Sequence, residues 1–377
     1  MRIDPLSTHR WVEDKAGLLA LEQSLRVVAS MSLDSESNSG FVFEERLCLL
    51  QINDGQQIWL VDLLALSAGK GALDTLKPFL EDPAYEVQLH GGEFDVGCLK
   101  RDYEISLAGV WDTQQAASFL GWEKTGYGAV VERLCGVALP KAHTRSDWSR
   151  RPIEGEELQY AINDVRYLPE VSAALREEVR RADLEEEVLI ACRTVELATW
   201  NGGFRPEAFW NLKGVRQLSE SSQGILMALY SWREVIARQL DLPAGRAMNN
   251  EVLLALARNP PRQVDDLRRL GVPRRVAGKW SAELFAVIAE ARRDPPRLPP
   301  APTRRPHDRQ IQKRGDRIKK WRRGEAERRQ VPMQVVLPVA ALKYIQEHGA
   351  RDLESVPQLG RKRIEHYGET LRELVSD

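Results

Sequence analysis

The chain has 377 residues, 43% of them hydrophobic, and its 54 basic residues nearly balance its 55 acidic residues. This length and composition indicate an ordinary soluble globular protein of two or three domains, each with enough apolar residues for a core. No run of about 18 apolar residues could span a bilayer and the first residues lack the pattern of a secretion signal, so we expect no membrane partner and a cytoplasmic location.

Helix-like and strand-like segments alternate along the first half of the chain. The apolar spacing of residues 12–25 predicts a helix, as does that of residues 94–103. The strand-like segments are 26–33, 46–52, 56–63 and 85–90. The second and third of these flank the turn sequence Asn53-Asp54-Gly55, which predicts a hairpin. A hairpin followed by alternating strands and helices is typical of an α/β domain whose mixed sheet has helices on its faces.

Beyond about residue 185 the strand-like segments stop and the pattern becomes helical. The proline- and arginine-rich stretch 295–306 cannot form a continuous helix and predicts a stiff, extended linker between two helical units. Each unit contains a Trp-Arg pair, at Trp232 and at Trp321, and in each the tryptophan precedes a proline by eleven residues. Repeated helical units of this size usually arise by duplication of a small module.

The near-neutral net charge conceals a strongly basic segment. Residues 297–330 contain 13 Lys or Arg against 4 Asp or Glu, an excess of nine positive charges, so the rest of the chain sums to about −10. Such a segment is expected in a protein that binds a polyanion. The alternative is a solvated linker and helix face.

The candidate metal ligands are carboxylates, since the four cysteines are scattered without metal-ligand spacing and are interpreted as buried apolar residues. Asp34 and Glu36 lie two apart at the end of a predicted strand, so both side chains point to one face. Two carboxylates there repel each other unless a cation joins them, and oxygen ligands favour Mg²⁺ or Mn²⁺. The alternative is an exposed pair of residues in a turn.

Further candidate residues follow at usable spacing. Asp95 comes after the strand-like segment 85–90, at the predicted start of a helix and behind a Gly-Gly pair that lets the backbone approach a ligand. Tyr160 and Asp164 are four apart and therefore share one face of a helix. Asp95 as a helix cap and Tyr160 as a half-buried core residue are the structural alternatives.

The ordered series Asp-x-Glu, His-x4-Asp and Tyr-x3-Asp resembles the tyrosine-containing branch of the DEDD 3′-to-5′ exonucleases, and more closely the ribonuclease D family. Gln51, Asp112-Thr113 and the segment 144–153 match that family as well. The C-terminal units resemble HRDC modules, most clearly at 361–371. The resemblance implies a ribonuclease H-like α/β exonuclease domain at 1–205, all-α HRDC-like domains at 210–295 and 311–377, and a linker at 296–310.

The resemblance also implies a metal-dependent hydrolase. The implied ligands of two divalent cations, Mg²⁺ or Mn²⁺, are Asp34, Glu36, Asp95 and Asp164. Tyr160 would orient the attacking water through its hydroxyl, because its high reference pKa makes it a poor base. Each step would release a nucleoside 5′-monophosphate from the 3′ end of RNA, with a single-stranded tail or a tRNA precursor as the expected substrate.

Two alternatives remain beside an exoribonuclease: a 3′-to-5′ exonuclease directed at DNA, and a nucleic-acid-binding protein with little catalytic activity. Retention of all four carboxylates and the tyrosine favours an enzyme over the second of these. The chain has no GxxxxGK[ST] motif, which excludes helicase activity and indicates that no nucleotide cofactor is needed.

Basic and aromatic residues beside these motifs are candidates for nucleic-acid contact. They are His90, Lys141, Arg145, Trp148, Lys319, Lys320, Arg322 and Arg323. A hydrogen-bonded structural histidine is the alternative for His90, and core packing is the alternative for Trp148. The chain departs from the family at Ser35, where Thr is common, and at Ser37, where an apolar or aromatic residue could stack on the terminal base.

Overall fold

The computed structural model of the chain describes residues 9–66, 69–140, 146–301 and 309–376. The chain forms two compact units, one of residues 1–37, 47–201 and 305–377, and the other of residues 38–46 and 202–304. Within the described ranges no helix is both long enough and apolar enough to cross a membrane.

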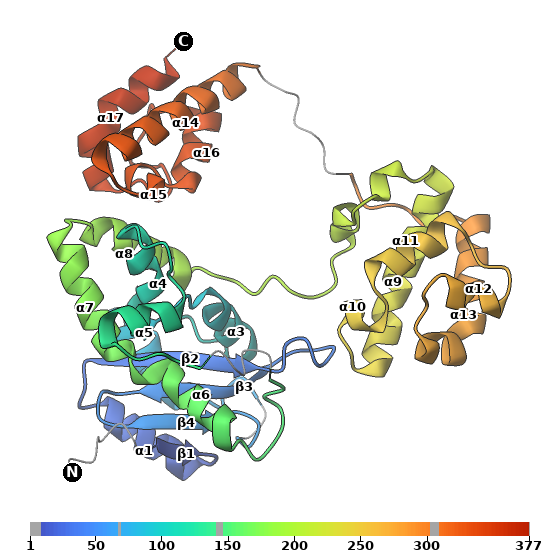
Figure 1. The fold of residues 1–377 in the computed structure, drawn as a ribbon, viewed down its shortest axis with the longest axis horizontal. Helices are drawn as coiled ribbons and strands as arrows, with labels where there is room; N and C mark the ends of the chain where they lie inside the picture. The colour runs from blue at the N-terminus through green and yellow to red at the C-terminus, as the bar shows by residue number, and fades with distance from the viewer. Residues whose placement is uncertain (1–8, 67–68, 141–145, 302–308, 377) are drawn as a thin grey trace. The chain divides into compact units, whose positions relative to one another are not determined.

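A six-stranded mixed sheet lies at the centre of the first unit (Figure 1). Its strands are β1 (His9–Val12), β2 (Ser30–Ser37), β3 (Leu47–Asn53), β4 (Ile58–Asp62), β5 (Glu86–Leu89) and β6 (Val110–Asp112), in the order β1-β4-β3-β2-β5-β6. The pairs β2–β3 and β3–β4 are antiparallel, whereas β1–β4, β2–β5 and β5–β6 are parallel. The predicted α/β fold is confirmed, although the outer strands β1 and β6 are too short to show a periodic pattern.

Helices cover the sheet on both faces. They are α1 (Lys15–Leu25), α2 (Lys77–Leu80), α3 (Glu93–Tyr103), α4 (Thr113–Phe119), α5 (Tyr127–Cys135), α6 (Gly155–Arg166), α7 (Leu168–Arg181) and α8 (Glu185–Glu196). The predictions of helices over 12–25 and 94–103 are confirmed as α1 and α3. The part of the first unit that precedes residue 202 is called the sheet domain below.

Strand β2, which carries the paired carboxylates, extends further at its C-terminal end than the sequence predicts. The prediction placed a strand at 26–33 and the carboxylates just beyond it, whereas β2 begins at Ser30 and includes both Asp34 and Glu36. The reason is that β2 pairs with β3 as far as Ser37, so the hydrogen-bonded ladder extends the strand through its polar residues. A register shift between Glu36 and Ser37 marks where regular pairing ends.

The two faces of the sheet bury different sets of side chains because successive residues alternate. Leu33, Leu50 and Ile52 point into the main core cluster, which also contains the apolar side of α1. The opposite face, to which Asp34 and Glu36 point, is covered by α6 (Figure 1). On that face the residues that pack under α6 include Leu49, Ile58 and Leu60. The sheet therefore presents its acidic pair to α6.

The second unit is helical and has its own core. Its α-helices are α9 (Glu220–Leu240), α10 (Ala244–Ala247), α11 (Asn250–Arg258), α12 (Val264–Arg269) and α13 (Arg274–Arg293), preceded by 3-10 turns at Pro206–Asn211 and Val215–Gln217. The unit also includes residues 38–46, the connection between β2 and β3, which the sequence did not indicate. Phe43 of that connection packs against the helical core, and its backbone N–H donates to Asp241 at 3.1 Å.

The C-terminal module, residues 309–376, repeats the design of the second unit. Its helices are α14 (Arg309–Arg329), α15 (Met333–Val336), α16 (Val339–His348) and α17 (Arg361–Val375). In both units a long helix carrying the Trp-Arg pair is followed by a four-residue helix whose N-cap is a proline, Pro243 or Pro332. The predicted repeat is confirmed. Of the predicted linker, residues 295–301 have no regular secondary structure and 302–306 lie outside the described residues.

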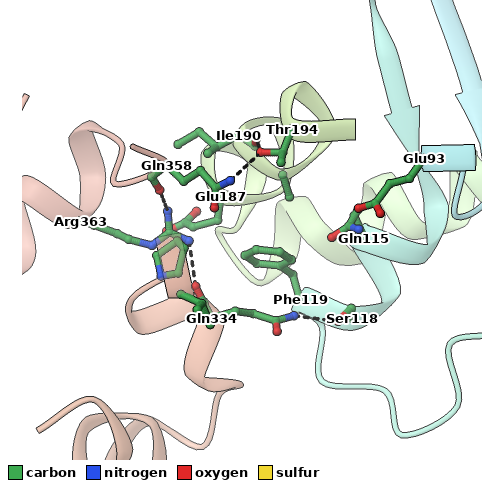
Figure 2. A pocket seen from close by; sticks show the side chains of 13 residues that line it. Glu93, Gln115, Ser118, Phe119, Glu187, Ile190, Thr194, Gln334, Gln358 and Arg363 are labelled. Atoms are coloured by element: carbon green, nitrogen blue, oxygen red, sulfur yellow. Dashed lines mark hydrogen bonds between the residues drawn. The ribbon is translucent and has the colours of Figure 1, made fainter. Parts of the chain in front are cut away.

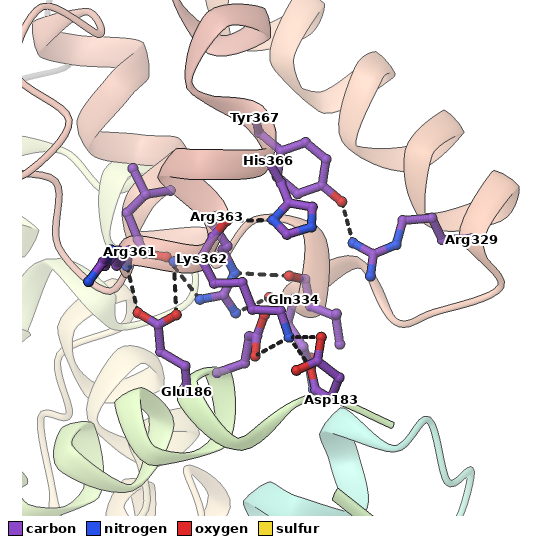
Figure 3. A network of polar contacts seen from close by, with 12 residues as sticks. Asp183, Glu186, Arg329, Gln334, Arg361, Lys362, Arg363, His366 and Tyr367 are labelled. Carbon is purple, nitrogen blue, oxygen red and sulfur yellow. Dashed lines mark hydrogen bonds and ion pairs between the residues drawn. The ribbon is translucent and has the colours of Figure 1, made fainter. Parts of the chain in front are cut away.

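The C-terminal module packs on α8 of the sheet domain (Figure 3). The Glu186 carboxylate accepts the backbone N–H groups of Arg361 at 2.6 Å and Lys362 at 2.8 Å, and so caps the start of α17. Lys362 Nζ lies 2.6 Å from a carboxylate oxygen of Asp183. Val335 of the module belongs to the main core cluster of the sheet domain. The contact therefore combines a helix cap, an ion pair and apolar burial.

Candidate active site

Three acidic side chains converge on the face of the sheet that α6 covers. Asp34 and Glu36 come from β2 and Asp164 comes from α6, and one carboxylate oxygen of each lies within 4.8 Å of the others. Asn53 of β3 fixes the end of α6 to the sheet by donating to the backbone carbonyl of Val165 at 3.0 Å. All three acidic side chains are half-buried, so the cluster lies at the surface but is partly withdrawn from water.

Asp95 supplies a fourth carboxylate from the first turn of α3. It is buried and accepts a hydrogen bond from the hydroxyl of Ser35, the residue between Asp34 and Glu36. Ser35 points away from the face that α6 covers, because side chains alternate along β2. This explains why Asp95 borders the three-residue cluster and is not part of it.

The four carboxylates have raised pKa values. For Asp34 the largest cause is burial, followed by the charges of Asp95, Asp164 and Glu36, and the pKa lies well above its usual value. Burial, then Asp164 and Asp95, raises the pKa of Glu36 in the same way. Burial raises the pKa of Asp95 to about 6, and burial with the charge of Asp95 raises that of Asp164 to about 8. Such a cluster binds protons unless a cation takes their place.

The residue composition of the cluster fits a divalent metal ion. Among the described residues no Lys or Arg forms an ion pair with any of the four carboxylates, so no basic residue in that part of the chain balances their charge. Carboxylate oxygens are the preferred ligands of Mg²⁺ and suit Mn²⁺ as well. The cluster therefore has the ligand type and the excess negative charge that such an ion requires.

Tyr160 lies on α6 one turn before Asp164, close enough to Asp164, Glu36 and Asp34 for their charges to act on its hydroxyl. A hydrogen bond joins its hydroxyl to Asp164. Burial, followed by the charge of Asp164, raises the pKa of Tyr160, so the phenol keeps its proton at neutral pH. Its ring packs against Trp148, with 5.9 Å between the ring centroids. The hydroxyl is thus held at the acidic cluster by contacts on both sides.

The segment that carries Trp148 is fastened to the sheet by Arg151. Its guanidinium contacts both carboxylate oxygens of Asp62, at 2.6 and 2.7 Å, and donates to the carbonyls of Trp148 at 2.8 Å and Cys48 at 3.0 Å. Trp148 is only 2% exposed and belongs to the cluster under α6. Its position corresponds to the core-packing alternative, and it leaves no ring face at the surface for a base.

His90 lies in the interior beside α4. The Thr113 hydroxyl donates to the Leu89 carbonyl at 2.8 Å, so the His90 Nδ1–H donates to Thr113 Oγ1 at 2.9 Å. Burial lowers the pKa of His90, and its Nε2 is buried with no hydrogen-bond partner in the part of the chain that the structure describes. His90 is therefore placed as a hydrogen-bonded structural histidine would be, which is the alternative to nucleic-acid contact. Two other candidates for nucleic-acid contact, Lys141 and Arg145, lie outside the described residues.

The candidate contact residues of the basic segment all lie on α14, in different surroundings. Lys320 and Arg323 are exposed. Lys319 is also exposed and lies 3.5 Å from the Asp316 carboxylate. Arg322 is half-buried and its Nε donates to the Met333 carbonyl at 3.0 Å. Only part of the predicted basic face is therefore available to a ligand.

Sequence reasoning missed the residues that support the acidic cluster. The pair Arg151–Asp62 joins positions 89 residues apart, and nothing in either local pattern indicates it. The contact between Ser35 and Asp95 spans 60 residues. Asp112 accepts from the N–H groups of Gly92, Gln114 and Gln115 and so links the starts of α3 and α4; its match to the family was the only signal.

A separate cavity of about 200 Å³ lies where the C-terminal module meets the sheet domain (Figure 2). None of the four carboxylates lines it. Polar groups bond to each other across the boundary: Gln334 donates to Ser118 at 2.7 Å and Gln358 donates to Thr194 at 3.0 Å. The cavity is therefore part of the packing of the module and is distinct from the acidic cluster.

Comparisons with known proteins agree on one family. The family described as 3′-5′ exonuclease matches residues 9–180, and the HRDC domain family matches 222–288 and 312–375. The curated protein "Ribonuclease D" of Granulibacter bethesdensis is 32% identical over 282 residues, which cover 73% of this chain and 69% of that protein.

Solved structures show the same fold over nearly the whole chain. The structure of RNase D from Escherichia coli, described as an exoribonuclease involved in structured RNA processing, matches with a TM-score of 0.72 at 24% identity and covers 98% of both chains. A protein from Bifidobacterium adolescentis matches with a TM-score of 0.78 at 19% identity, over 97% of this chain and 96% of that one.

Proposed function

Because the chain belongs to the ribonuclease D family of 3′-to-5′ exonucleases, we propose that it removes nucleotides one at a time from the 3′ ends of RNA. The substrates we propose are single-stranded tails and tRNA precursors, and the product of each step is a nucleoside 5′-monophosphate. The convergence of Asp34, Glu36 and Asp164 within 4.8 Å, with Asp95 beside them, carries the proposal.

The acidic side chains would hold two divalent cations, Mg²⁺ or Mn²⁺. Such ions supply a water of lowered pKa and stabilise the leaving oxygen of a phosphodiester. Asp34 and Glu36 are held in place for this task because their part of β2 pairs with β3, while the start of β2 also pairs with β5. Ser35 fixes the rotamer of Asp95 by its hydrogen bond, and α6 brings Asp164 onto the same face.

Tyr160 acts in this proposal by orienting the attacking water. Its raised pKa makes it a hydrogen-bond donor at neutral pH and excludes it as a general base. The neighbouring Asp164 accepts a hydrogen bond from it, so the phenol stays aligned with the cluster in the resting site. Trp148 beneath the ring limits its movement.

Tyr160→Phe is expected to lower kcat by about 10- to 100-fold with little change in KM or Tm, because the ring packing remains and only the hydroxyl is lost. Tyr127→Phe is the matched control, since the Tyr127 hydroxyl donates to α6 at the Asn163 carbonyl, 3.1 Å away, but is not part of the cluster. We expect this control to keep kcat within about twofold. Equal losses in both variants, measured by mononucleotide release, would contradict the role of Tyr160.

The RNA partner requires basic surface outside the acidic site. The C-terminal module has a cavity of about 590 Å³ at the end where α14, α16 and α17 meet. Arg314, Arg351 and Arg372 line it, together with His348, and no carboxylate does among the described residues. The guanidinium groups of Arg351 and Arg372 have no ion-pair or hydrogen-bond partner within the described ranges. We propose this cavity, with Lys320 and Arg323 on α14, as the phosphate-contacting surface.

The double substitution Arg351→Gln/Arg372→Gln is expected to weaken RNA binding and to reduce its dependence on log[salt] by about 1.4, since each single-strand phosphate contact contributes about 0.7. Arg180→Gln/Arg181→Gln changes the net charge equally and removes two exposed arginines that pair with Glu177. A salt titration of binding to labelled RNA compares the two. An equal reduction of the slope would mean that overall charge, and not this cavity, captures RNA.

The substrate is tested with single-stranded RNA and DNA labelled at the 3′ end, in Mg²⁺, Mn²⁺ or chelator. Release of labelled mononucleotide from RNA that stops with chelator is the expected result. Much faster release from DNA would favour the DNA-directed alternative. Binding of both polymers with release from neither would overturn the enzymatic proposal in favour of a binding protein.

A further inference from the structure

Gln51 is a polar side chain in the most buried part of the sheet. It lies in the middle of β3 and is 0% exposed. Neither Nε2 nor Oε1 of its side-chain amide has a hydrogen-bond partner among the described residues. A buried amide without partners costs free energy that a native core rarely tolerates, so such a group normally meets an ordered water or another ligand. An apolar side chain of the same size would fill this position at no such cost.

The position of Gln51 shows what its amide can reach. In the ladder between β2 and β3, Gln51 is the direct partner of Asp34, so the two side chains share one face of the sheet at neighbouring positions. On its other side Gln51 pairs with Leu60, which packs under α6. The amide therefore lies between the acidic pair of β2 and the apolar floor below α6.

The helix above Gln51 contributes a second buried polar atom without a partner. Asn53, two residues further on the same face of β3, is fixed to the Val165 carbonyl at 3.0 Å, which places the turn containing Asp164 over this part of the sheet. Oδ2 of Asp164 is buried and has no hydrogen-bond partner within the described residues. Both groups without partners thus lie at the acidic face of the sheet. The Gln51 amide is on β3, and the Asp164 carboxylate is on the helix that covers it, α6.

We propose that Gln51 is a positioning residue of the active site, which holds a buried water that bridges its amide to Asp164. The amide Nε2–H donates to the water, and the water donates to Oδ2 of Asp164. This bridge fixes the carboxylate orientation that metal binding requires, and Asp34 is confined between the amide and Glu36. The inference rests on the proposed metal-dependent function but assigns Gln51 no contact with substrate. Partners of this kind commonly change metal affinity by about 10- to 100-fold.

The test is Gln51→Leu, with Gln51→Met as a second variant of more similar length in case leucine impairs folding. Calorimetric titration of Mn²⁺ into RNA-free protein measures metal affinity independently of activity. We expect the dissociation constant to rise by about tenfold or more, because Asp164 loses the group that orients its carboxylate.

Gln88→Leu is the matched control in the same sheet. Gln88 is also buried, but its Oε1 accepts from Ser32 at 2.8 Å and its Nε2 donates to Glu86 at 2.9 Å. This variant should lower the Tm by about 3 °C and leave Mn²⁺ affinity unchanged. If both Gln51 variants bind Mn²⁺ as tightly as the wild-type protein does, the inference about Gln51 is overturned and the proposed function still stands. If the wild-type protein binds no Mn²⁺, the proposed function fails and the inference with it.

Discussion

Asp34→Asn is expected to abolish exonuclease activity, with kcat lower by about 10³-fold or more, and at the same time to stabilise the metal-free protein. The asparagine keeps the shape of the side chain but loses a charged oxygen ligand. The stabilisation follows from the electrostatics: burial, then Asp95, Asp164 and Glu36, raises the pKa of Asp34, so its ionised form is unfavourable in the folded state. Opposite effects on activity and on stability are what distinguish a ligand cluster from ordinary surface acids.

Asp62→Asn is the control for this prediction. Burial raises the pKa of Asp62, but the hydrogen bonds and charge of Arg151 outweigh it and hold the pKa below its usual value. Loss of that charge should therefore destabilise the protein, by about 3 kcal/mol. Mononucleotide release and thermal unfolding in chelator measure both effects. An Asp34→Asn protein that keeps a tenth of its activity, or that unfolds as early as Asp62→Asn, would show that the cluster does not hold the catalytic metal.

The sequence predicts this site well where its residues lie in short, regular patterns. The two-residue spacing of Asp34 and Glu36 and the four-residue spacing of Tyr160 and Asp164 each determine a shared face, and both pairs meet in the structure. The sheet class follows from the hairpin around Asn53-Asp54-Gly55. What the spacing cannot give is the packing of α6 across β2, because that depends on apolar contacts between distant segments.

The less predictable features all depend on contacts between distant parts of the chain. The basic segment is obvious from composition, yet the Arg322 Nε donates to the Met333 carbonyl. The proposed phosphate surface combines Arg314 of α14, Arg351 of the loop after α16 and Arg372 of α17. Likewise the loop-like sequence around Trp148 makes it a candidate for base stacking. In the structure Arg151 bonds to both the Trp148 carbonyl and Asp62 of β4, which holds this segment against the sheet. For a side chain with both a polar and an apolar part, the sequence alone does not decide between a structural role and ligand contact, because its tertiary partner determines which it has.

The loss of stability with rising pH should become smaller when metal is added. Because the folded-state pKa values of the cluster are raised, the folded protein binds more protons than the unfolded chain. The stability that these groups contribute is present below about pH 4 and is lost as the pH rises through about 6 for Asp95 and about 8 for Asp164. Each such group contributes a slope of up to about 1.4 kcal/mol per pH unit.

Metal binding requires ionised carboxylates, so excess Mg²⁺ should restore stability most at high pH. At a concentration 100 times the dissociation constant it should add about 2.7 kcal/mol. Thermal unfolding between pH 5 and 8.5, in chelator and in Mg²⁺, measures the two profiles, and Asp164→Asn should flatten both. Since the same four groups bind either protons or metal, a Tm in Mg²⁺ that parallels the chelator profile at every pH would mean that the cluster binds protons only. Profiles that coincide at low pH and diverge as the pH rises would instead show that the acidic face of the sheet is stable at neutral pH because a cation replaces its protons.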